Sequence, residues 1–130
     1  MTIIYGLLGL GLVIIIHEAG HFIAARLSGV TVETFSVGMG PVLAHKKIKD
    51  TDYRISLIPL GGYCGMKGEK AFQEALDNKL SEIPSEPGSF YGVHPLKRLF
   101  IAFSGPFFNF LFAIISFSIF IQVLPLKTMF

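Results

Sequence analysis

The sequence predicts an α-helical membrane protein in which two transmembrane helices are joined by a cytoplasmic loop with a small membrane-associated β-hairpin. Hydrophobic residues make up 52% of the 130 residues and charged residues only 15%, unlike a soluble domain of this size. The apolar residues gather in two blocks, 3–25 and 99–124, each long enough to cross about 30 Å of hydrocarbon as a helix. Short β-branched runs separated by turn residues lie between them and predict the hairpin.

The first block predicts a transmembrane helix over residues 1–27. Its one charged side chain is Glu18, and its other polar groups are Tyr5, His17 and His21. A cleaved signal peptide is the alternative interpretation of an apolar N-terminus. This block has no basic residue before it and a longer apolar run than a signal peptide needs. We therefore expect the segment to remain part of the protein.

The distribution of charge predicts the orientation in the membrane. Ten of the eleven Lys and Arg residues lie from Arg26 to Arg98, between the two apolar blocks, and the other is Lys127. Positive charge beside membrane-spanning segments marks the cytoplasmic side. We expect a multi-pass protein of the inner, cytoplasmic membrane, with a cytoplasmic loop and both ends of the chain outside. The net charge of +2 is too small to suggest a nucleic-acid partner.

The segment HEAGH at residues 17–21 fits the pattern H-E-x-x-H. On a helix, residues i and i+4 share a face, so His17 and His21 can reach one Zn²⁺. Glu18 lies about 100° around the helix from His17, given 3.6 residues per turn. It can reach a zinc-activated water without binding the metal, which predicts a general base.

Two other interpretations of this motif are possible. A five-residue match can arise by chance on a solvated helix, but ionisable groups inside a membrane are costly and indicate function. The same groups could also form a metal or proton transport site. If Arg26 marks the membrane boundary, His21 lies about 7 Å and His17 about 14 Å below it, at 1.5 Å per residue. Hydrolysis at that depth requires a water path, which we expect from the cytoplasmic side.

Three motifs make the sequence resemble the site-2 proteases, the intramembrane zinc metalloproteases. They are HEAGHF at residues 17–22, FSVGMGP with ISLIPLGGYCGM at 35–41 and 55–66, and FSGPFFNFLFAI at 103–114. The resemblance spans nearly the whole chain. Within the family, the sequence is most similar to the bacterial branch represented by the regulator of sigma-E protease. It implies an enzyme that hydrolyses peptide bonds in transmembrane segments of substrate proteins, of the anti-sigma factor or remnant signal peptide type.

The resemblance also implies roles for individual residues. His17 and His21 would be Zn²⁺ ligands, and Glu18 would be the catalytic base. Asn109 matches the asparagine of the family's Gly-Pro-x-x-Asn element, here residues 105–109, and would contact the substrate near the scissile bond. The expected partners are therefore transmembrane protein substrates and the lipid bilayer.

One departure from the family concerns the third zinc ligand. In the family it is an aspartate of a Leu-Asp-Gly motif in a later membrane helix, and the sequence contains neither that helix nor the PDZ domain expected after the second helix. A catalytic zinc normally takes three protein ligands plus water. We therefore expect an N-terminal portion of a longer enzyme. A catalytically silent partner that binds transmembrane helices is the alternative.

Residues 28–68 are expected to form the β-element, with short strands at 31–37, 42–48 and 53–58 and a polar turn at 49–52. An apolar, glycine-rich loop follows at 58–63. By resemblance, this element re-enters the membrane, and its edge pairs with an unwound substrate. A purely structural hairpin is the alternative. The residues assigned to substrate binding on this basis are Leu57, Ile58, Leu60, Gly61 and Gly62.

The remaining segments complete the expected organisation. Residues 69–97 are expected to form an amphipathic helix and a linker, because apolar side chains recur at helical spacing within 70–83. Residues 98–125 are expected to form the second transmembrane helix, and 126–130 the start of an extracytoplasmic segment.

Overall fold

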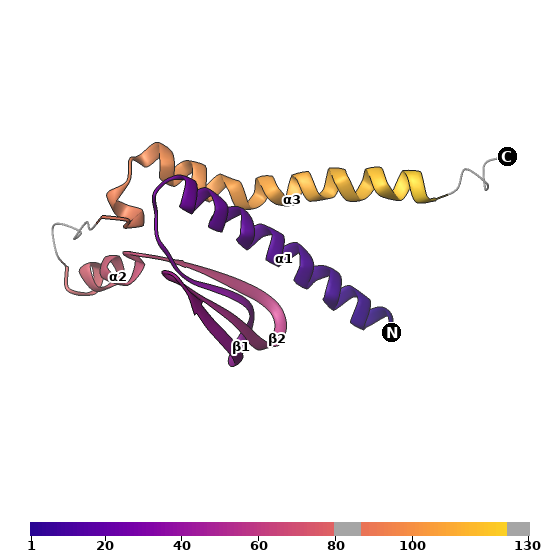
Figure 1. Cartoon of the computed structure of the whole chain (residues 1–130), viewed down its shortest axis with the longest axis horizontal. Helices are drawn as coiled ribbons and strands as arrows, with labels where there is room; N and C mark the ends of the chain where they lie inside the picture. The colour runs from indigo at the N-terminus through magenta and orange to yellow at the C-terminus, as the bar shows by residue number, and fades with distance from the viewer. Residues whose placement is uncertain (80–86, 125–130) are drawn as a thin grey trace.

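The computed structural model describes residues 1–79 and 87–124, and it contains three α-helices, one short 3₁₀ helix and two long strands within those ranges. Helix α1 lies between α3 on one side and the β-sheet on the other (Figure 1). The last turns of α1 meet the first turns of α3, and the two helices diverge toward the chain termini. In chain order the elements are α1 (Thr2–Leu27), β1 (Val32–Ile48), β2 (Thr51–Met66), α2 (Glu69–Asp77), η1 (Phe90–Gly92) and α3 (Pro95–Val123).

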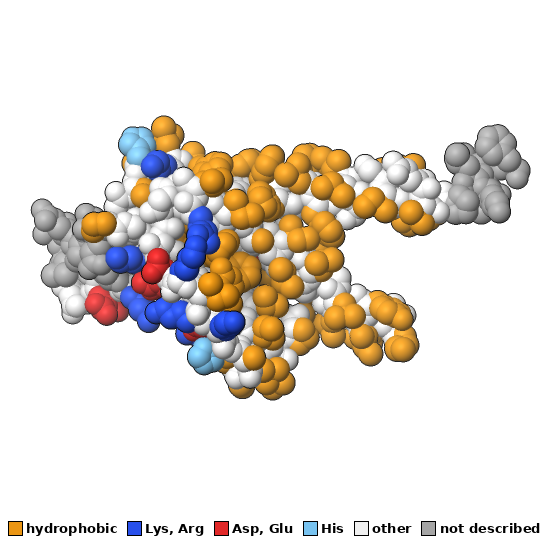
Figure 2. Space-filling view, viewed as in Figure 1, with side chains coloured by type: hydrophobic (Ala, Val, Ile, Leu, Met, Phe, Trp, Pro, Cys, Tyr) orange, Lys and Arg blue, Asp and Glu red, His pale blue; other side chains and the backbone are white. Residues whose placement is uncertain are grey.

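The two long helices are apolar along their length, as the sequence predicts. α1 has 26 residues and α3 has 29, and both are long and apolar enough to cross a membrane. Hydrophobic side chains cover the helices, whereas Lys and Arg side chains gather at the opposite end of the molecule from the chain termini (Figure 2). The structure thus has two long apolar helices and, between them in the sequence, a small antiparallel sheet. This confirms the predicted combination of elements and supports a membrane location.

Local sequence signals set the ends of these helices. At the end of α1, Gly29 has a φ of 80°, Val30 N–H donates to the Ala25 carbonyl at 2.9 Å, and Gly29 N–H donates to the Arg26 carbonyl at 3.3 Å. This is a Schellman motif, which requires a residue that tolerates positive φ. α3 begins with Pro95 in its first turn, after His94, whose side chain accepts a hydrogen bond from the Leu96 N–H.

The sheet differs from the expected one. We expected three short strands and a loop at 58–63, but the structure has two long strands, and residues 58–63 belong to β2. Residues 34–37 have pairing partners on both sides, 52–55 and 62–65, so both strands curl and the end of β2 returns alongside β1. Gly38, Gly40 and Gly61 have positive φ values and allow these bends. The glycine-rich segment expected to be a loop is therefore a bend within a continuous strand.

A small core joins the end of α1 to the sheet and to the start of α3. Its buried residues are Ala24, Ala25, Val30, Val32, Cys64, Met66 and Ile101. Beside it, α2 packs through Phe72, whose ring stacks on Tyr91 of η1 at a centroid distance of 4.4 Å. Three predicted segments extend outside the described residues: 80–86 of the amphipathic helix and linker, residue 125 of the second transmembrane helix, and all of 126–130.

Candidate active site

The two motif histidines face one another across one turn of α1. Their Nε2 atoms are 3.1 Å apart, and their rings meet edge to face with centroids at 4.8 Å. Zinc bound by two imidazoles has Zn–N bonds of about 2.0–2.1 Å at tetrahedral angles, which puts the two nitrogens about 3.3 Å apart. The spacing of His17 and His21 therefore suits two ligands of one zinc ion.

Each ring has a partner at its other nitrogen, and both partners come from α3. His21 Nδ1 lies 2.8 Å from the Ile101 carbonyl oxygen, to which an Nδ1–H can donate. His17 Nδ1 lies 3.2 Å from the side-chain amide of Asn109. A ligand histidine normally makes such a contact at the nitrogen that does not bind the metal, because it fixes the tautomer and the ring orientation. The two helices thus orient both rings together.

Two glycines make this helix contact close. A Cβ atom added to Gly105 would lie 2.5 Å from His21 Nε2 and 2.8 Å from His17 Nε2. A Cβ atom added to Gly20 would lie 2.5 Å from the Ser104 carbonyl oxygen. Small residues permit such approach between membrane helices. The space in front of the histidine nitrogens therefore depends on the absence of a side chain at Gly105.

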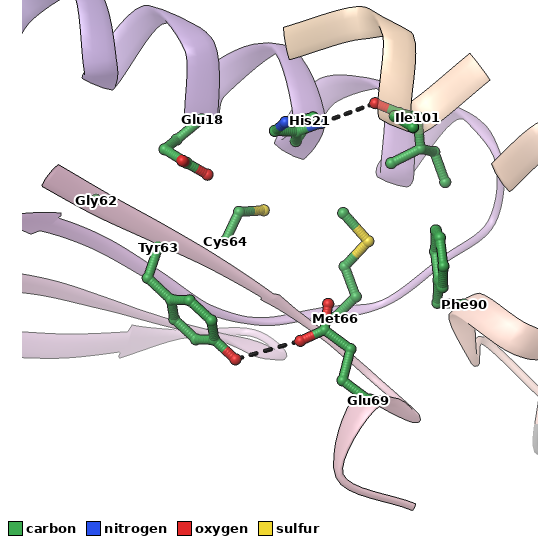
Figure 3. A pocket seen from close by; sticks show the side chains of 10 residues that line it. Glu18, His21, Gly62, Tyr63, Cys64, Met66, Glu69, Phe90 and Ile101 are labelled. Carbon is green, nitrogen blue, oxygen red and sulfur yellow. Dashed lines mark hydrogen bonds between the residues drawn. The ribbon is translucent and has the colours of Figure 1, made fainter. Parts of the chain in front are cut away.

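Glu18 and His21 both line a cavity of about 310 Å³ between α1, β2 and the start of α3. Figure 3 shows Glu18 and His21 projecting from α1 toward Cys64 and Met66 of β2. The end of β2 forms one wall and the start of α3 another, and α2 and η1 contribute one residue each, so the cavity joins elements from most of the chain. The residues that line it are Glu18, His21, Gly62, Tyr63, Cys64, Met66, Glu69, Phe90, Ile101 and Ala102.

The end of β2 passes very close to the catalytic-base candidate. Among the described residues, segment 62–66 pairs with β1 on one side only. A Cβ atom added to Gly62 would lie 3.1 Å from Glu18 Cγ and 3.3 Å from Ile14 Cγ2. Gly62 therefore lets this strand, which is paired on one side only among the described residues, run close to Glu18. Of the five strand residues assigned to substrate binding, it is the one that lines the cavity.

The other four strand residues lie in the bend of β2, before its final segment. Leu57 and Ile58 are exposed, with 57% and 46% of their surface accessible, and Leu60 and Gly61 are partly buried. They do not line the cavity beside Glu18. The structure therefore brings together His17, Glu18, His21, Asn109 and Gly62, and it places the bend residues farther along the strand.

Several cavity residues were not singled out from the sequence. Tyr63 donates a hydrogen bond from its hydroxyl to Glu69 at 3.2 Å, shown as a dashed line in Figure 3. Burial raises the pKa of Glu69, and burial followed by the neighbouring Glu18 raises the pKa of Cys64 to about 12. The thiol of Cys64 is therefore neutral at pH 7 in the metal-free protein.

A sequence signal for some of these residues did exist. In a strand, alternate side chains share a face, so an assignment of Gly62 to the site implies Cys64 and Met66 as well. Glu69 and Phe90 carry no such signal, because they belong to separate elements, α2 and η1.

Within residues 1–79 and 87–124, no group of three His, Cys, Asp or Glu side chains is placed to hold a metal ion. The histidine pair fits zinc as two ligands, and a catalytic zinc normally takes a third protein ligand. The donors present therefore match part of a catalytic zinc site.

An HExxH pair on one face of a long apolar helix, contacted by a second such helix, is typical of a membrane metalloprotease. The model of peptidase family M50 matches residues 5–127, and the chain belongs to this family.

Curated relatives agree with this assignment. A relative from Treponema pallidum is 61% identical over 114 residues, covering 88% of this chain and 25% of its own length. A relative from Borreliella burgdorferi is 44% identical over 118 residues, covering 90% of this chain and 27% of its own length. A relative from Chlamydia trachomatis is 42% identical over 123 residues, covering 92% of this chain and 20% of its own length. Each is named "Putative zinc metalloprotease". The chain thus spans about a quarter of the length of these relatives.

Proposed function

We propose that this chain supplies two zinc ligands and the catalytic base of an intramembrane zinc metalloprotease of the site-2 type. One observation carries the proposal: the Nε2 atoms of His17 and His21 are 3.1 Å apart, and Glu18 lines the same cavity as His21, next to a strand segment that is paired on one side only among the described residues. Zinc ligands, a carboxylate base and a surface that can bind an extended peptide are the parts that peptide hydrolysis requires.

His17 and His21 would hold the zinc ion through their Nε2 atoms, and the third ligand would be an aspartate from another part of the protein. Bound zinc activates water and polarises the scissile carbonyl. The Glu18 carboxylate would accept a proton from water and pass it to the departing amine nitrogen. Glu18 is next in sequence to one ligand and faces the same cavity as the other, so it can act on a reacting group without occupying the metal.

The end of β2 would bind the substrate. A transmembrane helix hides its peptide bonds in its own hydrogen bonds, whereas a peptide added to a strand edge is extended and exposes them. Segment 62–66 has such an edge beside Glu18. The apolar bend, with Leu57 and Ile58 exposed and Leu60 and Gly61 partly buried, would contact the substrate before it reaches the cavity. The substrates would be transmembrane segments of the anti-sigma factor or remnant signal peptide type.

The decisive test separates the base from the ligands in the full-length protein, purified in detergent. Glu18→Gln should retain zinc and lower cleavage of a transmembrane substrate by at least about 100-fold, as expected for loss of a general base. His17→Ala should lose zinc as well as cleavage. Glu69→Gln is the matched control, because Glu69 is a carboxylate in the same cavity. Wild-type cleavage by Glu18→Gln would exclude the proposed mechanism.

The proposed location is the inner membrane, with the segment between α1 and α3 in the cytoplasm. The basic residues between the two helices support this orientation. In a Cys64→Ala background, a cysteine at Asp50 should react with a membrane-impermeant reagent only from the cytoplasmic side. A cysteine at Thr2 should react only from the opposite side. The reverse labelling pattern would contradict the orientation.

A further inference from the structure

The two candidate zinc ligands are oriented by different kinds of group. His21 Nδ1 faces a backbone oxygen, that of Ile101, at 2.8 Å. His17 Nδ1 faces a side chain, with Asn109 Nδ2 at 3.2 Å. Asn109 Oδ1 is enclosed and has no hydrogen-bond partner among the described residues. The side-chain amide of Asn109 therefore touches a candidate zinc ligand, His17, while its own oxygen is enclosed without a partner. Buried polar atoms are normally hydrogen-bonded, so this arrangement requires a physical reason.

The chemistry of a ligand histidine provides that reason. When Nε2 binds a metal, the neutral imidazole carries its proton on Nδ1, so Nδ1 is a donor and needs an acceptor. The Ile101 carbonyl is such an acceptor for His21, whereas an NH₂ group opposite His17 Nδ1 would place two donors face to face. The oxygen and nitrogen of an Asn amide are assigned from their hydrogen-bond partners. Turning the amide of Asn109 by 180° gives His17 an acceptor and the amide oxygen a donor.

We propose that Asn109 is a positioning residue of the zinc site, whose Oδ1 accepts a hydrogen bond from Nδ1–H of His17 and fixes that ring toward the metal. The proposal rests on the proposed function, since it assumes that His17 binds zinc. Asn109 lies one turn after Gly105, on the same face of α3. This face therefore leaves room in front of both Nε2 atoms at Gly105 and orients the His17 ring at Asn109. The role differs from the substrate contact that the resemblance implies for Asn109.

The test measures zinc affinity in the full-length protein in detergent, by competition with a chelator of known affinity. Asn109→Leu removes the acceptor at similar size and should weaken zinc binding about 10–100-fold, the usual cost of losing a partner of a ligand histidine. Asn109→Asp keeps an acceptor and removes the NH₂ group, and its zinc affinity should stay close to wild type. Ser118→Ala is the control on the same helix, because Ser118 is exposed and its hydroxyl donates to the Ile114 carbonyl of the same helix. Its zinc affinity should not change.

Two results would overturn the proposal. The first is wild-type zinc affinity in Asn109→Leu together with a raised KM, which would assign Asn109 to the substrate. The second is an Asn109→Asp protein that binds zinc as weakly as Asn109→Leu, which would show that the acceptor is not what matters. Asn109→Ala, which also removes the acceptor, takes the place of the Leu variant in both comparisons if the Leu variant does not fold. A wild-type protein that binds no zinc would instead refute the proposed function, so the two failures are distinguishable.

Discussion

The α1–α3 contact and the curled β-sheet border the same cavity but are built in opposite ways. In the helix contact, Ala25 and Ile101 are 0% and 1% exposed, and glycines bring backbone and histidine rings into direct contact. In the bend of the sheet, Met39, Leu43 and Leu57 are 59%, 63% and 57% exposed. One region is closely packed, and the other presents apolar side chains outward.

This difference matches the two tasks of the proposed enzyme. Metal ligands must be held within a few tenths of an ångström, which requires packed neighbours and fixed hydrogen bonds. A surface that receives a peptide or lipid must keep apolar side chains and a strand edge unpaired until the partner arrives. We therefore expect changes in the helix contact to affect zinc, and changes in the sheet to affect cleavage while zinc remains bound.

The largest effect is expected from Gly105→Ala. The added methyl group would lie within 2.5 Å and 2.8 Å of the two histidine Nε2 atoms, the positions that would face the metal. Zinc affinity and cleavage should both be lost, as measured by chelator competition and by a substrate assay. Gly9→Ala is the matched control, because a Cβ there meets nothing within 4 Å. Normal zinc binding by Gly105→Ala would contradict the metal position.

A smaller effect is expected from Gly62→Ala, which adds a methyl group 3.1 Å from Glu18 Cγ. Glu18 or the strand must then shift by a few tenths of an ångström. Cleavage should fall about 10-fold, since a displacement of 1 Å can cost about 100-fold, while zinc content stays normal. Metal analysis and initial rates on the same preparation check this. Loss of zinc in this variant would remove the distinction between the two regions.

Leu57→Pro tests whether main-chain bonding along β2 contributes to unwinding. Proline cannot donate a backbone hydrogen bond, and losing one bond is worth about 0.5–1.5 kcal/mol, or about 2–10-fold in rate. Cleavage of a stable transmembrane helix should fall by that factor, and cleavage of a substrate with Gly or Pro at the cut site should fall less. Leu57→Ala, which keeps the N–H, is the control. Equal losses on both substrates would argue against unwinding by this strand.

The smallest effect is expected from Tyr63→Phe. The substitution removes the hydroxyl that donates to Glu69 at 3.2 Å and keeps the ring, and the bond is exposed to solvent. Exposed hydrogen bonds contribute little because water replaces them. Zinc affinity should be unchanged, and cleavage should change by less than about 2-fold. A large loss of cleavage in kinetic assays would show that Tyr63 acts on the substrate itself.

The sequence by itself determined the two long helices and the pairing of His17 with His21. Both depend on local patterns, since an apolar run of sufficient length forms a membrane helix and residues i and i+4 share a face. The helix ends also follow local rules, with Gly29 after α1 and Pro95 at the start of α3. The strands were less predictable, because the glycine-rich segment 58–63, which suggested a loop, is a bend within β2.

The tertiary structure alone decided which distant groups meet the motif. Asn109 contacts His17 across 92 positions, the Ile101 carbonyl contacts His21 across 80, and Gly62 lies against Glu18. Periodicity specifies the face of a helix but not the partner that packs there. That choice depends on close backbone approach at Gly20, Gly62 and Gly105, where a single Cβ atom would separate the elements. The cavity beside Glu18 exists because α1, β2 and α3 converge there with residues of α2 and η1, and no local pattern contains that information.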